Sequence, residues 1–179
     1  MRLLGVNMWK WRLTFPAQTK YVVFVKQDWR KDEEKPRLRQ IMGISLNPKI
    51  PPLASDLHDI LVRWTDSQTE YITCTLDGDT FGIGSASGDE LFKNRGFALR
   101  SNGSSKSDPT EVKLNEPFAL VRAAYRGDVT YDGTEFAEGA EKRNDRTLSL
   151  ILLATDKKVP SLELSPQWED GKVVMGLRK

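Results

Sequence analysis

The chain has 179 residues, of which 39% are hydrophobic and 29% are charged, and its formal net charge is +2 at pH 7. These proportions are typical of soluble globular proteins, so extensive disorder is not expected. A near-neutral chain lacks the basic balance of a dedicated duplex-DNA binder, so no nucleic-acid partner is expected. His58 and Cys74 are the single histidine and the single cysteine, too few for a zinc site. We expect neither a metal nor a cofactor.

The amino-terminal part is predicted to form strands. In residues 8–15 apolar and polar side chains alternate strictly, with Trp9, Trp11, Leu13 and Phe15 on the apolar side. A period of two predicts a half-buried strand.

The same region is basic, because residues 1–27 contain five Lys or Arg and no acidic residue. We expect Lys10 and Arg12 to lie on the solvated face of the strand. Acidic side chains from elsewhere in the nearly neutral chain should balance them.

Two further strands are predicted in the next stretch. Residues 20–26 are rich in β-branched and aromatic side chains, which favours a central strand. Residues 40–46 resume strand character before prolines interrupt it. Between them, residues 26–39 carry six basic and four acidic side chains around Trp29 and Pro36. This composition predicts an exposed excursion or a long hairpin loop.

A helix is predicted over residues 53–64. Five apolar residues there have helical spacing and would form a stripe that packs on the sheet: Leu53, Leu57, Ile60, Leu61 and Trp64. A short strand over residues 60–62 is the alternative.

A hairpin follows, with strands over residues 70–76 and 80–83 joined at Asp77-Gly78. Another strand is expected over residues 97–100. Residues 101–109 are rich in Ser, Asn and Gly and are predicted to form a flexible loop.

The chain beyond residue 110 is predicted to form a helix and several strands. Asn115 with Pro117 in the first turn predicts a helix, and a strand over residues 118–123 is the alternative. A hairpin is expected over residues 129–136. Residues 148–154 are the most apolar run, which predicts the central buried strand.

The last strand is expected over residues 173–175, after an Asp170-Gly171 turn. These elements together predict an α+β fold that is β-rich, with a mixed, mainly antiparallel sheet or sandwich and one to three short helices. We expect a single domain over residues 1–179.

Two tryptophans are the candidate binding residues. Trp29 lies in the charged excursion, and Trp168 lies in a segment flanked by Pro and Asp. Both are expected in loops, where binding residues are common. We therefore interpret the chain as a non-enzymatic binding domain for a protein or glycan partner.

A small hydrolase is the alternative function. Paired carboxylates suffice for glycoside hydrolysis, although 25 acidic residues leave the pair unassigned, and His58 beside Asp59 suggests general-base chemistry. Adjacent helical residues do not face each other, which disfavours that role. A Cys74 in a strand is typically a small buried hydrophobe.

Location is not specified by the sequence. The lone cysteine slightly favours the cytoplasm, with export as the alternative if an amino-terminal signal has been removed. No run of about 18 apolar residues is present to span a bilayer. The oligomeric state is not indicated.

Overall fold

The computed structural model describes residues 2–3, 6–46, 57–65, 70–76, 79–85, 97–101, 109–125, 139–140, 143–157 and 163–178. The chain divides into two compact units whose segments alternate along the sequence. The first comprises Met1–Ala17, Asn47–Asn94 and Gly103–Val112; the second comprises Gln18–Leu46, Arg95–Asn102 and Lys113–Lys179. The single domain expected from the sequence stays a prediction.

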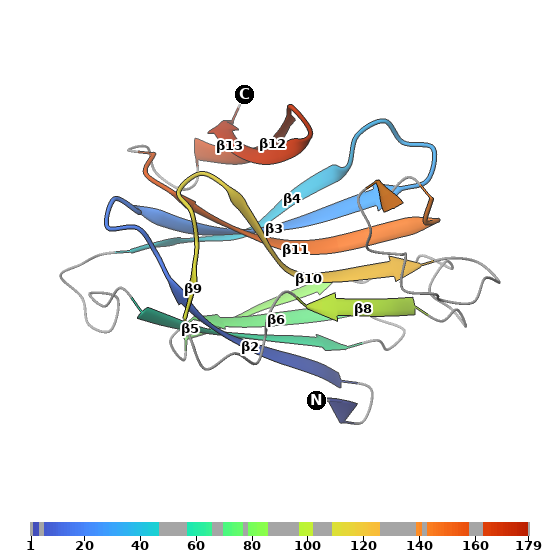
Figure 1. Ribbon diagram of the computed structural model, residues 1–179, viewed down its shortest axis with the longest axis horizontal. Coiled ribbons are helices and arrows are strands. Elements are labelled where there is room, and N and C mark those ends of the chain that lie inside the picture. Colours follow the sequence, from blue (N-terminus) through green and yellow to red (C-terminus); the bar gives the residue numbers. More distant parts are fainter. Residues whose placement is uncertain are drawn as a thin grey trace. The chain divides into compact units, whose positions relative to one another are not determined.

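The first unit is built on a sheet with the order β1-β2-β5-β6-β7, in which neighbouring strands run antiparallel (Figure 1). A short strand, β9, pairs in parallel with β2. The predicted strands over 70–76 and 80–83 are confirmed, and the turn between them lies outside the described residues. The strands are β1 (Arg2–Leu3), β2 (Val6–Thr14), β5 (Leu57–Thr65), β6 (Glu70–Leu76), β7 (Asp79–Ser85) and β9 (Thr110–Glu111).

Alternation along β2 builds the core of this unit. Trp11 and Leu13 are buried, whereas Lys10 and Arg12 are exposed, as the pattern of residues 8–15 predicted. β5 lies alongside, and its buried Ile60 is the register partner of Trp11. Apolar side chains on one face of both strands are thereby removed from water, which is the main favourable term in folding.

The predicted helix over residues 53–64 is wrong. Residues 57–65 form β5, which pairs with β2 on one side and β6 on the other, and residues 53–56 lie outside the described part. The apolar spacing fitted a helix, but positions 58, 60 and 62 are buried in strand alternation. Pairing on both sides satisfies the backbone polar groups, so tertiary context overrides the local pattern.

The second unit contains a five-stranded sheet with the order β4-β3-β11-β10-β8, antiparallel throughout. Its central strand, β11, is buried along its whole length, which confirms the central strand predicted over residues 148–154. The strands predicted over residues 20–26, 40–46 and 97–100 are confirmed. The strands are β3 (Tyr21–Arg30), β4 (Arg37–Ser45), β8 (Phe97–Ser101), β10 (Pro117–Tyr125) and β11 (Arg146–Thr155).

The helix predicted after Asn115 is also wrong, because β10 occupies that segment and pairs with β8 and β11. The alternative strand was correct. The described residues contain no α-helix, so the β-rich, mainly antiparallel class is confirmed and the short helices are not. The hairpin expected over residues 129–136 and the loop residues 102–108 lie outside the described part.

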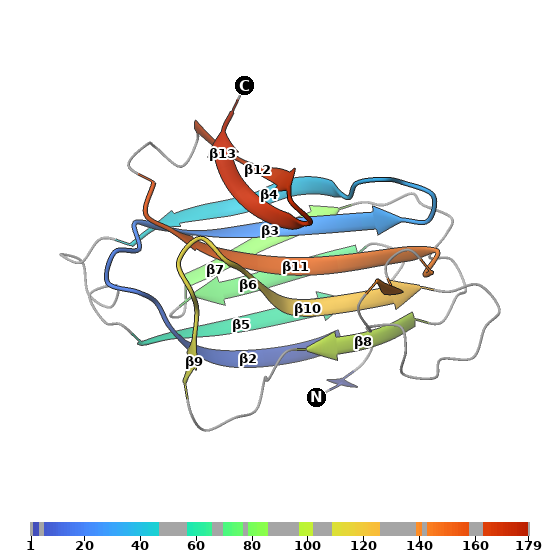
Figure 2. The same cartoon turned by 45° about the horizontal axis from the view of Figure 1, so that its top comes forward.

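A hairpin of β12 (Leu164–Glu169) and β13 (Lys172–Leu177) covers one face of the second sheet near β3 and β4 (Figures 1 and 2). Its last strand confirms the one predicted over residues 173–175. The hairpin and the sheet share an apolar core, and the half-buried side chain of Trp168 packs against it. The buried members are Val23, Val25, Ile151, Leu153, Leu164, Val173 and Met175.

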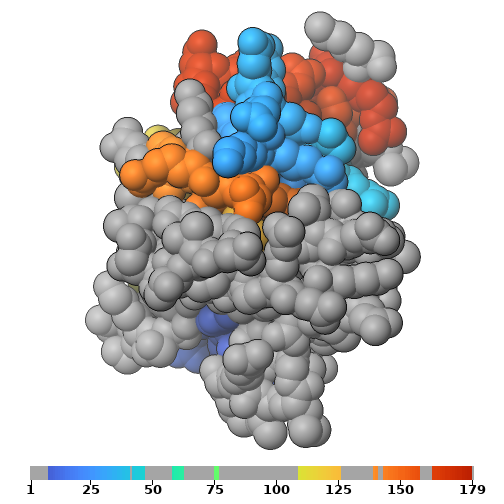
Figure 3. Space-filling model, turned by 90° about the vertical axis from the view of Figure 1, so that its right-hand side faces the viewer, coloured from blue at the N-terminus to red at the C-terminus, as the bar shows by residue number. Residues whose placement is uncertain are grey.

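The connection between β3 and β4 lies beside the start of β11, and Figure 3 shows the two segments in blue and orange. The backbone N–H of Lys31 donates to the carbonyl oxygen of Asp145 at 3.0 Å. The side chains of the same two residues form an ion pair at 3.9 Å. The exposed excursion expected over residues 26–39 is shorter than predicted. Most of these residues belong to β3 and β4, and only the six residues 31–36 connect the two strands.

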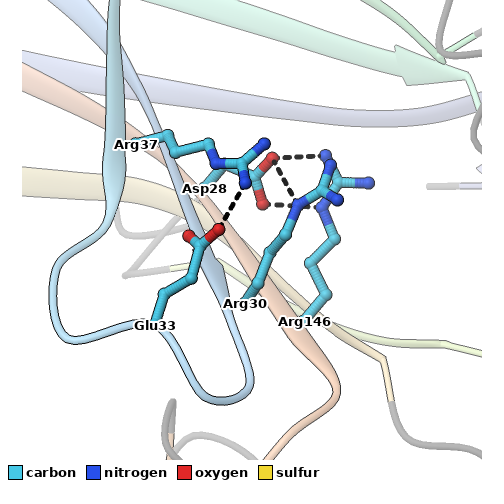
Figure 4. A network of polar contacts seen from close by, with 5 residues as sticks. All are labelled: Asp28, Arg30, Glu33, Arg37 and Arg146. Carbon is cyan, nitrogen blue, oxygen red and sulfur yellow. Dashed lines mark hydrogen bonds and ion pairs between the residues drawn. The ribbon is translucent and has the colours of Figure 1, made fainter.

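A buried ion pair joins β3 to β11 (Figure 4). Arg146 donates through Nε and Nη2 to the two carboxylate oxygens of Asp28, at 2.6 and 2.5 Å. The side chains of Arg146 and Asp28 are only 5% and 13% exposed. Arg30 Nε lies 3.8 Å from the same carboxylate. A bidentate pair of this kind stabilises the contact between the two strands and also requires one particular geometry of the two side chains.

Breaking this pair should strongly destabilise the second unit. Arg146→Met leaves a buried carboxylate with only the more distant Arg30, and we expect a loss of about 3 kcal/mol in the free energy of unfolding, measured in urea. The double variant Asp28→Leu/Arg146→Met should be less destabilised than Arg146→Met alone. Arg37→Gln, which breaks an exposed pair with Glu33, is the control and should cost less than about 1 kcal/mol. Equal losses in the buried and exposed variants would contradict this.

Candidate functional site

The second unit contains a pocket of about 390 Å³ beneath the tip of the β12–β13 hairpin, within the size range of ligand sites. Its wall combines aromatic, hydroxyl, amide and cationic side chains from β3, β10, β11 and the hairpin. The lining residues are Gln27, Trp29, Pro117, Phe118, Ala119, Arg122, Gly139, Thr147, Ser149, Ile151, Trp168, Gly171, Lys172 and Val173.

The pairing of β3 with β11 forms the floor of the pocket. Trp29 is the register partner of Thr147, and Gln27 is the partner of Ser149. Paired residues of an antiparallel sheet point to the same face. Further along that face the paired residues are apolar and are covered by the hairpin. The face therefore turns polar where the shared apolar core ends.

A β-bulge in β10 directs Arg122 to this face. The register with β11 shifts between Ala119 and Val121, so that Ala119 pairs with Ile151 and Arg122 pairs with Ser149. Without the extra residue, strict alternation would place Arg122 on the opposite face. Bulges commonly redirect a side chain beside a functional site.

The turn of the β12–β13 hairpin closes the pocket on another side. Asp170 and Gly171 have φ values of 48° and 78°, the positive values that a two-residue type I′ turn requires. The turn predicted at Asp170-Gly171 is therefore confirmed. It joins Glu169 to Lys172. Lys172 and Trp168, the residue before Glu169, both line the pocket.

The two predicted binding residues lie against each other here. The ring centroids of Trp29 and Trp168 are 5.4 Å apart, with an interplanar angle of 73°, an edge-to-face geometry that aromatic pairs favour. Both residues lie in strands, so their expected loop locations were wrong. Trp29 is only 6% exposed. The sequence placed it in a charged excursion because β3 extends further than the apolar run suggested.

One donor in the wall, the indole N–H of Trp29, lacks an acceptor among the described residues. The indole Nε1 of Trp29 is buried without a hydrogen-bond partner, which costs about 1–3 kcal/mol for a neutral group. Asn144 Nδ2 donates to the hydroxyl oxygen of Thr147 at 2.9 Å. A hydroxyl oxygen that accepts this bond keeps its own hydrogen for donation.

Sequence reasoning missed the polar and cationic part of the wall. Thr147 and Ser149 precede two apolar residues on the same side of β11, and this change along one face was a signal that the sequence contained. Arg122 had no such signal, because its face depends on the bulge. Lys172 lines the pocket because it directly follows the Asp170-Gly171 turn of the hairpin.

His58 and Cys74 do not belong to this pocket. His58 lies in β5 of the first unit, is 2% exposed, and has its ring centroid 5.0 Å from that of Phe15. Cys74 lies in β6, as the strand prediction placed it. Among the described residues no group of three His, Cys, Asp or Glu is arranged to hold a metal. No helix in this part of the chain is long and apolar enough to cross a membrane.

The basic side chains of β2 meet an acidic partner from β5, as the sequence analysis expected. Lys10 Nζ lies 2.7 Å from Asp59 Oδ2, and Arg12 Nε lies 3.3 Å from Oδ1. The hydrogen bond from Lys10 is the largest cause that lowers the pKa of Asp59 below its ordinary value of 3.8. Partial burial acts in the opposite direction, and Arg12 reinforces Lys10.

Comparison of the chain with known protein families, curated proteins and solved structures gave no match.

The lowered pKa of Asp59 predicts that the stability of the fold depends on pH. A carboxyl with a depressed pKa in the folded state stabilises the fold above its unfolded pKa, and this stabilisation is lost as the pH falls through the folded value. Asp59→Asn should therefore lower stability above about pH 5 and converge with the unsubstituted protein well below pH 3.8. Urea unfolding at several pH values measures this. Lys10→Ala should reproduce part of the effect, and an unchanged pH dependence in Asp59→Asn would refute the assignment.

Proposed function

We propose that this chain is a non-enzymatic binding domain whose pocket around Trp29 and Trp168 holds a glycan partner. The observation that carries the proposal is the edge-to-face pair of these tryptophans in the wall of a pocket. The pair comes from β3 and β12, which are far apart in the sequence. Aromatic faces present a large apolar surface, against which the C–H side of a sugar ring can pack.

The polar side chains beside the tryptophans suit a sugar. Gln27, Thr147 and Ser149 offer amide and hydroxyl groups that both donate and accept hydrogen bonds. Each hydroxyl group of a sugar does the same. An apolar pocket with a few convergent polar groups is the usual form of a small-molecule site.

A glycan fits the described surface better than a protein partner. Leu177, which is 58% exposed, is the one large hydrophobic side chain recorded as exposed among the described residues. Stable protein interfaces bury about 800 Å² on each partner and use aromatic or apolar anchors near their centre. The tryptophans here face a pocket, which suits a ligand that enters it.

No observation favours the alternative hydrolase. The described residues that line the pocket include no Asp, Glu, His or Cys, whereas glycoside hydrolysis uses a pair of carboxylates. His58 is buried against Phe15 in the other unit. We therefore do not propose a reaction at this pocket.

The proposal predicts that Trp168→Ala weakens glycan binding. A panel of soluble neutral and acidic oligosaccharides is titrated against the full chain, with intrinsic tryptophan fluorescence and calorimetry as readouts. We expect affinity for the ligands that bind to fall by at least about tenfold, or about 1.4 kcal/mol. Leu177→Ala, on the same hairpin but exposed, is the control and should bind normally.

Trp168 also packs on the apolar core, so a second variant separates binding from folding. Ser149→Ala removes a pocket hydroxyl without removing an aromatic ring, and it should also weaken binding while thermal unfolding stays unchanged. Full binding by folded Trp168→Ala and Ser149→Ala proteins would overturn the proposal. So would the failure of every oligosaccharide to bind the unsubstituted chain.

A further inference from the structure

We propose that the ligand of this pocket is an acidic sugar, bearing a carboxylate or a sulfate group. This inference rests on the proposed function and names its substrate class. Among the described residues that line the pocket, Arg122 and Lys172 are cationic and none is acidic. A nearly neutral chain would be expected to mix both signs, so this imbalance within one concave wall points to a negatively charged ligand.

The two cations are available to a ligand. Both residues are exposed, and neither forms an ion pair with any described residue. Glu169 is the register partner of Lys172 across the hairpin turn, but it does not line the pocket. Arg122 has no acidic register partner, because it pairs with Ser149 on one side and Arg100 on the other.

The backbone holds both cations in place through specific features. The bulge in β10 puts Arg122 on the pocket face, next to Ser149. The Asp170-Gly171 turn is followed at once by Lys172, which begins β13 and lines the pocket. The two cations therefore come from different elements of the second unit. A guanidinium presents a planar fork that matches carboxylate or sulfate oxygens.

Neutral donors in the wall favour the same charge. The bond that Thr147 accepts from Asn144 leaves the hydroxyl hydrogen of Thr147 for donation. The N–H of Trp29 is a buried donor without an acceptor in the described part of the chain, so a negatively charged group nearby would reduce the cost of its burial.

The observations favour a sugar over a nucleotide, which also combines a ring with negative charge. Trp29 and Trp168 meet edge to face, so they leave no parallel slot to sandwich a flat base between them. Gln27 and Ser149 supply acceptors as well as donors, which hydroxyl groups of a sugar use and phosphate oxygens do not.

The test uses matched ligands and matched variants of the full chain. Disaccharides that contain a uronic acid are compared with the same disaccharides after reduction of the carboxylate to a hydroxymethyl group, and with sulfated disaccharides and nucleoside monophosphates. Binding is measured by calorimetry at low and high salt. We expect acidic disaccharides to bind more tightly than the reduced ones, and this advantage to shrink as salt rises.

Single variants test whether the preference for acidic disaccharides depends on the cations of the pocket. Arg122→Gln and Lys172→Gln should each weaken binding of the acidic disaccharides by about 10-fold to 100-fold and leave binding of the reduced ones unchanged. Lys113→Gln removes an exposed cation of the same unit that does not line the pocket and should have no effect.

Three results would overturn the inference. Equal binding of the acidic and the reduced disaccharides would reject the charge preference and leave the binding function intact. Binding of nucleoside monophosphates without binding of acidic disaccharides would reject the sugar. If no saccharide of either charge binds, the proposed function itself fails.

Discussion

The register between β3 and β11 is the constraint on which the second unit depends, and the Asp28–Arg146 pair holds it from one face. Asp28 and Trp29 are adjacent in β3, and Arg146 and Thr147 are adjacent in β11. Neighbours along a strand point to opposite faces, so the ion pair lies on the face behind the Trp29–Thr147 pair. A slip of one residue would separate the carboxylate from the guanidinium and would move Trp29 away from the pocket.

The same strand pairing provides both an apolar core and a polar pocket. Toward the end of β11 the sheet face beneath the hairpin is apolar. Its side chains there pack against those of the hairpin and are Val23, Val25, Ile151 and Leu153. Toward the start of β11 the same face carries hydroxyl groups. The hairpin is anchored by the apolar half, and its tip extends over the polar half. Stable packing and an accessible pocket therefore share one sheet face without competing for the same residues.

Two local backbone features complete the pocket, and of these the sequence predicted the hairpin turn but not the bulge. The bulge in β10 changes which face Arg122 occupies. The turn at Asp170-Gly171 reverses the chain with two residues of positive φ, and so places Trp168 and Lys172 at the same wall. Because the two cations depend on separate backbone features, the sequence did not indicate that both line one pocket.

The sequence by itself determined the strands whose pattern has a period of two or is uniformly apolar, such as β2 and β11, and it selected Trp29 and Trp168 as candidates. It could not separate helix from strand in β5 and β10, because their apolar spacing satisfies both until neighbouring strands supply backbone hydrogen bonds. The tertiary structure alone decided that the two tryptophans touch and that Arg122 faces the pocket. The reason is physical: register, bulge and hairpin turn act between segments that are distant along the chain, whereas a local pattern reports only on its own residues.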